Sequence, residues 1–166
     1  MHISKVLLAF IIIFGFIFPS CAEPDDVAQI KTLERNLATA AEARNLDAIM
    51  QSYVADDSLF VFDVIPPRQY VGARAFRKDW DDFLAGTKGP LRFEITDMDV
   101  AAVGDLAYGH SIQRIVATST KGEPIDLTTR VTDVYRKLNG KWVIVQEHIS
   151  IPVDLDTGKP DFSSRP

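Results

Sequence analysis

The stretch RVTDVYRKLNGKWVIVQEHIS, residues 130–150, holds two runs of alternating apolar and polar residues joined at Asn139-Gly140. Asn-Gly between two such runs is a strong signal for a β-hairpin. Asp133, Glu147 and His148 lie within the runs, at positions where strands usually carry β-branched or aromatic residues. The hairpin therefore indicates the fold class, and its register decides which of these ionisable side chains face the core.

The period-two pattern extends upstream of the hairpin. Four strands are expected, at 91–103, 106–118, 125–138 and 141–151. Turn residues separate them at Gly104-Asp105 and at 121–124. The alternation slips at Thr96–Asp99, which predicts a β-bulge in the first of these strands.

The part of the chain before these strands is mainly helical. Pro24-Asp25-Asp26 favours a helix start, and apolar residues then recur at helical spacing: Val27, Ile30, Leu33, Leu37, Ala40 and Ala41. Asn45 can cap a short second helix, 58–64 is a strand candidate, and 73–84 a third helix ended by Gly86. Helices followed by an antiparallel meander predict an α+β domain, with the helices against one sheet face.

Composition excludes several classes of function. The 166 residues are 46% hydrophobic and 25% charged, as in an ordinary single globular domain. No cluster of Lys and Arg interleaved with aromatic residues is present, which argues against nucleic-acid binding. There is no glycine-rich nucleotide fingerprint and no HExxH motif, and the distant pair His110 and His148 gives no support for a metal site. No cofactor is expected.

Residues 1–22 have the layout of a secretory signal. Lys5 precedes an apolar run, Val6–Phe18, that is followed by small residues up to Ala22. Cleavage after Ala22 predicts a periplasmic or secreted protein and would change the net charge from −5 to −6. Two alternatives remain open, lipidation at Cys21 and a retained membrane anchor. Because Cys21 is the single cysteine, no disulfide is expected in the domain.

The hairpin (131–150) resembles the C-terminal signature of SnoaL-like proteins, members of the nuclear transport factor 2-like superfamily. The stretches LDAIMQSYVADDSLFVFD (46–63) and VGARAFRKDW (71–80) are also similar to this family. The resemblance implies a cone-shaped curved antiparallel sheet wrapped around N-terminal helices and enclosing a pocket. Together with the signal layout and the polar, Pro/Gly/Ser-rich end of the chain, it gives three expected segments: a signal peptide (1–22), the SnoaL-like domain (23–152) and a polar tail (153–166).

Two relatives within this superfamily suggest roles for single residues. The segment AYGHSIQ (107–113) and the hairpin resemble the association domain of calcium/calmodulin-dependent kinase II. Its pocket arginines fall here on His110, Asp133 and Ile149, so the resemblance argues against an acid-binding pocket of that type. Compared with ketosteroid isomerase, Asp63 lies near the catalytic base and Asp133 near the protonated Asp, but its tyrosine position holds Leu37.

The register of the hairpin has two solutions. A two-residue turn at Asn139-Gly140 would leave both faces a mixture of charged and apolar side chains. A three-residue loop, Leu138–Gly140, would place Asp133 and Glu147 inward with the valines as diagonal neighbours, and turn Trp142 and His148 outward. We favour the three-residue loop.

These inferences give the following expected site. Asp63 or Asp133 is the candidate base, with His110 and Tyr108 as donors to a developing oxyanion. Pocket residues are expected to be Glu147, Trp80, Tyr53 and Tyr135. Arg130, Trp142 and His148 are expected at a homodimer interface or in a structural role.

The expected function is binding of a small, partly hydrophobic molecule, with cofactor-independent isomerase-, cyclase- or lyase-type proton transfer. The alternative is a non-catalytic ligand-binding, dimerisation or assembly module, in which the buried acids form a structural network.

Overall fold

The computed structural model describes residues 24–162, so the expected signal segment lies outside the described residues. The elements, in chain order, are α1 (Pro24–Glu42), α2 (Leu46–Met50), β1 (Phe60–Phe62), β2 (Tyr70–Val71), α3 (Ala73–Gly86), β3 (Thr87–Val103), β4 (Leu106–Ser119), β5 (Pro124–Leu138) and β6 (Lys141–Ser150). None of the helices in this part of the chain is long and apolar enough to cross a membrane.

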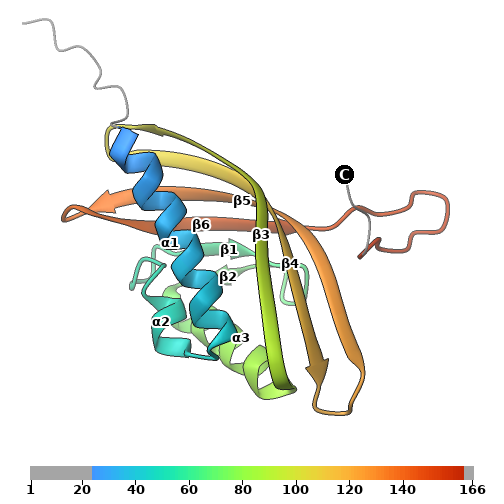
Figure 1. Ribbon diagram of the computed structural model, residues 1–166. Helices are drawn as coiled ribbons and strands as arrows, with labels where there is room; N and C mark the ends of the chain where they lie inside the picture. The colour runs from blue at the N-terminus through green and yellow to red at the C-terminus, as the bar shows by residue number, and fades with distance from the viewer. Residues whose placement is uncertain (1–23, 163–166) are drawn as a thin grey trace, which may run out of the picture.

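All six strands form one curved sheet in the order β2-β1-β6-β5-β4-β3. The pairs are antiparallel except for β1 and β6, which run parallel. Figure 1 shows α1 lying across one face of the sheet, with α2 and α3 grouped beside β1 and β2. The α+β prediction, with helices against one sheet face, is confirmed.

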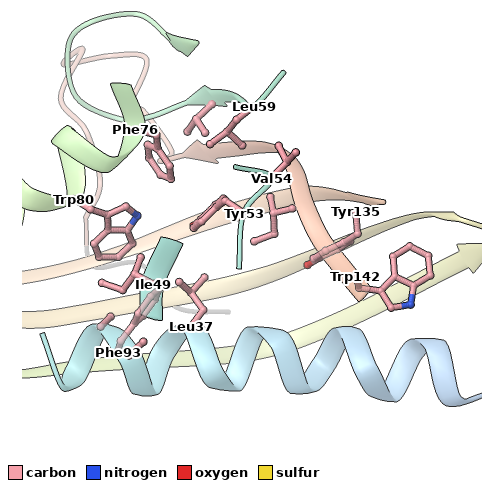
Figure 2. Packing of buried hydrophobic residues seen from close by; sticks show 14 of the residues in the cluster. Leu37, Ile49, Tyr53, Val54, Leu59, Phe76, Trp80, Phe93, Tyr135 and Trp142 are labelled. Atoms are coloured by element: carbon pink, nitrogen blue, oxygen red, sulfur yellow. The ribbon is translucent and has the colours of Figure 1, made fainter. Parts of the chain in front are cut away.

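The core fills the space between this face and the helices. From α1, Ile30, Leu37 and Ala41 point into it, spaced so that one stripe of the helix is buried. Figure 2 shows Phe76 and Trp80 of α3 packed near Tyr53, and Tyr135 directed toward α1. Burial of these side chains removes large apolar areas from water, which is the main source of stability.

The predicted long strands match the structure closely, and the bulge at Thr96–Asp99 is confirmed by a register shift between β3 and β4. Asp97 takes a positive φ of 50° within it. Strand β3 begins at Thr87, earlier than predicted, because its first residues pair with the end of β4. The candidate strand 58–64 is reduced to Phe60–Phe62.

The β5–β6 register differs from the prediction. Leu138 pairs with Lys141 across a two-residue turn in which Asn139 and Gly140 have φ of 50° and 80°, as a type I′ turn requires. The expected three-residue loop is therefore wrong. The extra residue lies further along β6, where Tyr135 pairs with Ile144 and Val134 with Gln146, so that Val145 forms a bulge.

This bulge changes which face each half of β6 presents. Before it, Trp142 and Ile144 are buried; beyond it, Glu147 is buried and His148 is exposed. The expected outward position of Trp142 is therefore wrong. Its indole nitrogen instead donates a 3.0 Å hydrogen bond to Asp26 of α1.

The segment after β6 turns back on itself. Val153 forms an isolated bridge with Pro160, and the backbone N–H of Thr128 donates to the carbonyl of Phe162 at 2.9 Å. Residues 152–162 thus return to β5, which extends beyond the end of β6.

Candidate functional site

A cavity lies between the concave face of the sheet and the helices. Its aromatic wall consists of Tyr53, Phe76, Trp80, Phe83 and Phe93. Three carboxyl side chains also line it, from Asp63, Asp79 and Glu147. Apolar walls with a few convergent polar groups are the usual composition of a small-molecule site.

The cavity has a volume of about 120 Å³. An engineered apolar cavity of about 150 Å³ holds one benzene molecule. The enclosed part of this cavity therefore fits a molecule of about the size of a six-membered ring, and larger ligands would have to extend through the opening.

Glu147 belongs to a buried carboxyl cluster, which we define as Glu34, Asp133 and Glu147. Asp133 on β5 pairs directly with Glu147 on β6, and directly opposed residues share a sheet face. The Tyr135 hydroxyl lies 2.8 Å from Glu34 Oε1 and 3.4 Å from Asp133 Oδ2. The Tyr53 hydroxyl lies 3.0 Å from Glu147 Oε2.

Tyr53 is held in place by its own backbone neighbours. The Ile144 N–H donates to the carbonyl of Ser52, and the Val54 N–H donates to the carbonyl of Ile144. The segment around Tyr53 thus forms a parallel bridge with β6 just before the bulge. This fixes the distance between the Tyr53 ring and Glu147.

Burial raises the pKa of every member of the buried carboxyl cluster, because charged carboxylates lose hydration there. The pKa of Glu34 is raised to about 7, mainly by burial, against a hydrogen bond from Tyr135. Burial and then the charge of Glu34 raise the pKa of Glu147 to about 8. The pKa of Asp133 lies well above its usual value, through burial and then the charges of Glu147 and Glu34. The cluster therefore holds protons at neutral pH.

A second pair of acids, Asp63 and Asp79, lines the cavity, and Asp79 also lines an adjoining outer groove; we call these two residues the rim pair. Burial, and then the neighbouring Asp79, raise the pKa of Asp63 to about 6, and the two carboxyls share a hydrogen bond. Tyr70 donates a 2.6 Å hydrogen bond to Asp79 from the other side. The rim pair thus holds one proton between two carboxyls in slightly acidic solution.

Trp80 contributes a hydrogen-bond donor without a partner. Its side chain is 9% exposed, and its indole nitrogen has no hydrogen-bond partner among the described residues. In Figure 2 this nitrogen points toward the side of the cavity formed by Phe76 and Tyr53. A buried donor without an acceptor is unfavourable unless a ligand or water supplies one.

The model of the SnoaL-like domain family matches residues 30–154. This range contains the whole cavity. The chain belongs to the SnoaL-like family. Residues 24–162 contain no group of three or more His, Cys, Asp or Glu side chains arranged to hold a metal ion.

Solved structures agree with this assignment. This SnoaL-like protein is 29% identical to a nuclear transport factor 2-like protein of unknown function from Pseudomonas putida KT2440, with a TM-score of 0.77 over 87% of this chain and 99% of that one. No curated protein matches the chain.

More distant structures share the fold. A proposed dehydratase from Streptomyces avermitilis is 18% identical, with a TM-score of 0.67 over 77% of this chain and 97% of that one. A proposed calcium/calmodulin-dependent protein kinase II association domain from Xanthomonas campestris is 20% identical, with a TM-score of 0.64 over 83% and 96%. At these identities the likeness establishes the fold alone.

The structure brings several predicted site residues of this SnoaL-like protein together. Asp63, Glu147, Tyr53 and Trp80 all line the cavity. Asp133 and Tyr135 are buried on the same face, at 2% and 1% exposure, but do not line the cavity. Asp133 therefore does not contact the cavity directly and is linked to it through its strand partner Glu147.

Tyr108 and His110 do not belong to the site. Both are exposed on the outer face of the sheet, while Gly109 between them is buried. The register explains why: Gly109 pairs with Asp133 and shares its inward face. A β-carbon at Gly109 would lie 3.3 Å from the Tyr135 ring and 3.2 Å from the Asp99 carbonyl oxygen, so a side chain there would require these neighbours to shift. The expectation that Tyr108 and His110 donate to an oxyanion in the pocket is wrong.

Arg130 and His148 are exposed on the outer face, as expected. Phe62 of β1 packs edge-on against the His148 ring, at 5.3 Å between centroids. His148 is thus away from the cavity.

Two site residues were missed in the sequence. Glu34 lies between Ile30 and Leu37 at helical spacing, and Asp79 lies between Phe76 and Phe83 in the same way. An acid within the apolar stripe of a helix is the signal that could have identified both.

Proposed function

We propose that this protein binds a small, largely apolar carbonyl compound in the cavity and shifts a proton on it without a cofactor. The main support for this proposal is that the Glu147 carboxyl group lines an aromatic cavity and has its pKa raised to about 8. A buried carboxylate of raised pKa is a strong base in a site that excludes water, which suits proton removal from carbon.

The proposed steps conserve atoms and charge. In its ionised form, which predominates only above about pH 8, Glu147 removes a proton from the carbon next to the carbonyl, and the electron pair moves to the carbonyl oxygen. The Trp80 N–H, which has no partner among the described residues, donates a hydrogen bond to that oxygen. Glu147 then returns the proton to a different carbon, which moves the double bond.

Tyr53 and Asp133 position Glu147 in this scheme. The Tyr53 hydroxyl donates to one of its oxygens, and Asp133, paired with it across the sheet, forms a further hydrogen bond to it. Asp63, the other candidate base, is assigned to ligand binding at the rim instead of proton transfer.

The test uses the unconjugated isomer of cyclohexenone, whose ring is of a size that the cavity fits. Formation of the conjugated ketone is followed by ultraviolet absorbance. We expect Glu147→Gln to lower the rate by about 10²-fold or more, the usual contribution of a general base. Glu123→Gln, in the exposed β4–β5 turn, is the matched control and is expected to keep the full rate. Equal rates for the two variants, or no turnover above buffer, would reject the catalytic proposal.

Non-catalytic binding is the second candidate. It is favoured by the hydrogen bonds of Tyr53 and Asp133 to Glu147, which also have a structural role. Saturable calorimetric binding of cyclohexenone without any isomerisation would select it. Some proteins with this fold are described as dehydratases, and one as an association domain, so the fold accommodates both.

We also propose a homodimer formed through the outer face of the sheet. One structure with this fold is described as a proposed association domain, and Tyr108, Leu106 and Val103 are more than half exposed on this face. Such a cluster of exposed apolar side chains is typical of an interaction surface. A dimer in light scattering, converted to a monomer by Tyr108→Glu, is the expected result; a monomeric parent protein would contradict it.

Export is proposed on the apolar run Val6–Phe18 and the small residues after it. Mass spectrometry of the protein recovered from its native host tests this. A chain that starts at Glu23 supports cleavage, and an acylated Cys21 supports the lipoprotein alternative.

A further inference from the structure

We propose that the ligand of this cavity carries a positive charge, in the form of a protonated amine held by Asp63 and Asp79. This inference names the ligand class of the site proposed above and therefore rests on the proposed function.

The charged groups at the cavity all have the same sign. Among the described residues that line it, three are carboxylic acids and none is Lys, Arg or His. An anionic ligand would meet repulsion and find no cation to pair with. A neutral apolar ligand would leave the rim carboxyls without a counterion when it displaced their water.

Among the described residues that line the adjoining groove there is a single cation, and it is already paired. Lys78 lines the adjoining groove, but its ammonium pairs with Asp82. Tyr70 faces Asp79 as a neutral hydrogen-bond donor, and Glu147 lies on the cavity side. Besides Lys78, which pairs with Asp82, the rim pair meets further acids, the Tyr70 hydroxyl and the backbone N–H groups of Val64 and Ile65.

A shared proton reduces the repulsion between the carboxyl groups of Asp63 and Asp79. Asp63 hydrogen bonds to Asp79, and its pKa is raised to about 6 by burial and by that neighbour. A protonated amine can replace this proton, because it brings one positive charge and up to three N–H donors to the same place.

The walls next to the rim pair also favour a cation. Phe83 and Phe76 line the cavity close to Trp80, with ring centroids 6.0 and 6.4 Å from its indole. Aromatic faces attract alkylammonium groups, most strongly where water is excluded. The Trp80 N–H has no partner among the described residues. We therefore expect the same ligand to carry a hydrogen-bond acceptor, such as the carbonyl oxygen of the proposed reaction.

Three probes of nearly equal shape separate charge from size: benzylamine, benzyl alcohol and benzoate. Binding to the full-length protein is measured by titration calorimetry at about pH 7.5, where Asp63 is ionised. We expect benzylamine to bind about tenfold or more tighter than benzyl alcohol, the usual range for a charge-assisted hydrogen bond. Benzoate is expected not to bind.

The variants locate the effect. Asp63→Asn and Asp79→Asn are expected to remove the preference for benzylamine by weakening benzylamine binding, while benzyl alcohol still binds. Asp81→Asn is the matched control, because it removes the same charge from an exposed position on α3 outside the cavity. Loss of the preference in Asp81→Asn as well would show long-range attraction only and would overturn the proposal.

The affinity for benzylamine, measured as a function of pH, gives a second readout. Affinity is expected to rise from about pH 5 to about pH 7 as the shared proton leaves the rim pair, since the amine stays protonated over this range.

The outcomes distinguish the two proposals. Benzyl alcohol binding as tightly as benzylamine would overturn the cationic ligand and leave the small-molecule site intact. Failure of all three probes, together with no binding of cyclohexenone, would overturn the small-molecule site and this inference with it.

Discussion

Tyr135 is the residue on which the buried carboxyl cluster most depends. It is 1% exposed, and its single hydroxyl proton faces Glu34 at 2.8 Å and Asp133 at 3.4 Å. One oxygen of each of these two acids has no hydrogen-bond partner among the described residues. Tyr135 therefore provides a donor that two acids share.

Replacing Tyr135 by Phe should lower the free energy of unfolding by about 1–3 kcal/mol, the usual penalty for leaving buried acceptors without a donor. Urea denaturation at about pH 7 measures it. Tyr108→Phe is the control, because this tyrosine is 58% exposed on the same sheet, and we expect a change within about 0.5 kcal/mol. Equal effects of the two substitutions would show that the hydroxyl of Tyr135 contributes no more than an exposed one.

At the scale of single residues, the sequence was informative where the strand pattern was clear. Asp133 and Glu147 were placed inward correctly, because their valine and tyrosine neighbours define the buried face. Tyr108 and His110 were assigned to the wrong face. Small residues such as Gly109 give no hydrophobic signal, even where they are buried.

Among the elements, the β5–β6 hairpin contains two irregularities that act together. The Asn139-Gly140 turn gives one register, and the Val145 bulge shifts it by one residue. Trp142 before the bulge and Glu147 beyond it therefore point to the same face. Neither uniform register considered from the sequence could place both inward.

The turn itself can be tested with two glycines in open surroundings. A β-carbon at Gly140 or at Gly86 would contact nothing within 4 Å, but Gly140 has a φ of 80° and Gly86 ends helix α3. Gly140→Ala should lower the free energy of unfolding by about 1–2 kcal/mol, since only the left-handed backbone is penalised there.

Gly86→Ala is expected to leave stability unchanged or raise it by up to about 1 kcal/mol, because alanine favours the helix. Thermal unfolding followed by circular dichroism compares the two variants. A gain in stability for Gly140→Ala would contradict the two-residue turn.

Some irregularities of the strands could be predicted from the sequence and others could not, for physical reasons. The bulge at Thr96–Asp99 was visible because the alternation slips there. The bulge at Val145 was not, because Val143, Ile144 and Val145 are all apolar and fit either face. Strand β2 has two residues and is too short to leave a periodic pattern.

At the scale of the whole molecule, the notable feature is a set of buried or half-buried acids that have no basic partner among the described residues: Glu34, Asp63, Asp133 and Glu147. The pKa values of Glu34 and Glu147 rise from 4.5 to about 7 and about 8, and that of Asp63 rises from 3.8 to about 6. Between the lower and upper values the folded protein keeps protons that the unfolded chain has released. In that window, stability falls as pH rises.

The urea midpoint should therefore decrease steadily from about pH 5 to about pH 8. Acids whose pKa is lowered by folding, such as Asp26 and Asp154, change stability only below about pH 4. They therefore do not mask the decrease of the urea midpoint between about pH 5 and about pH 8. The double variant Glu34→Gln/Glu147→Gln should show a flatter profile, and Glu123→Gln the parent one. A midpoint that increased over this range would contradict the protonated state of the cluster.

The Val145 bulge also determines how residues correspond between this protein and its relatives. Consider a relative whose final strand lacks the extra residue. In that strand, the residue that lies as many positions after the turn as Glu147 does here would face outward. The residue before it would face the cavity. An ungapped alignment would then match Glu147 with a solvent-exposed side chain. Cavity residues should therefore be compared across the family by superimposing the strands. A sequence alignment alone can be shifted by one residue in the final strand.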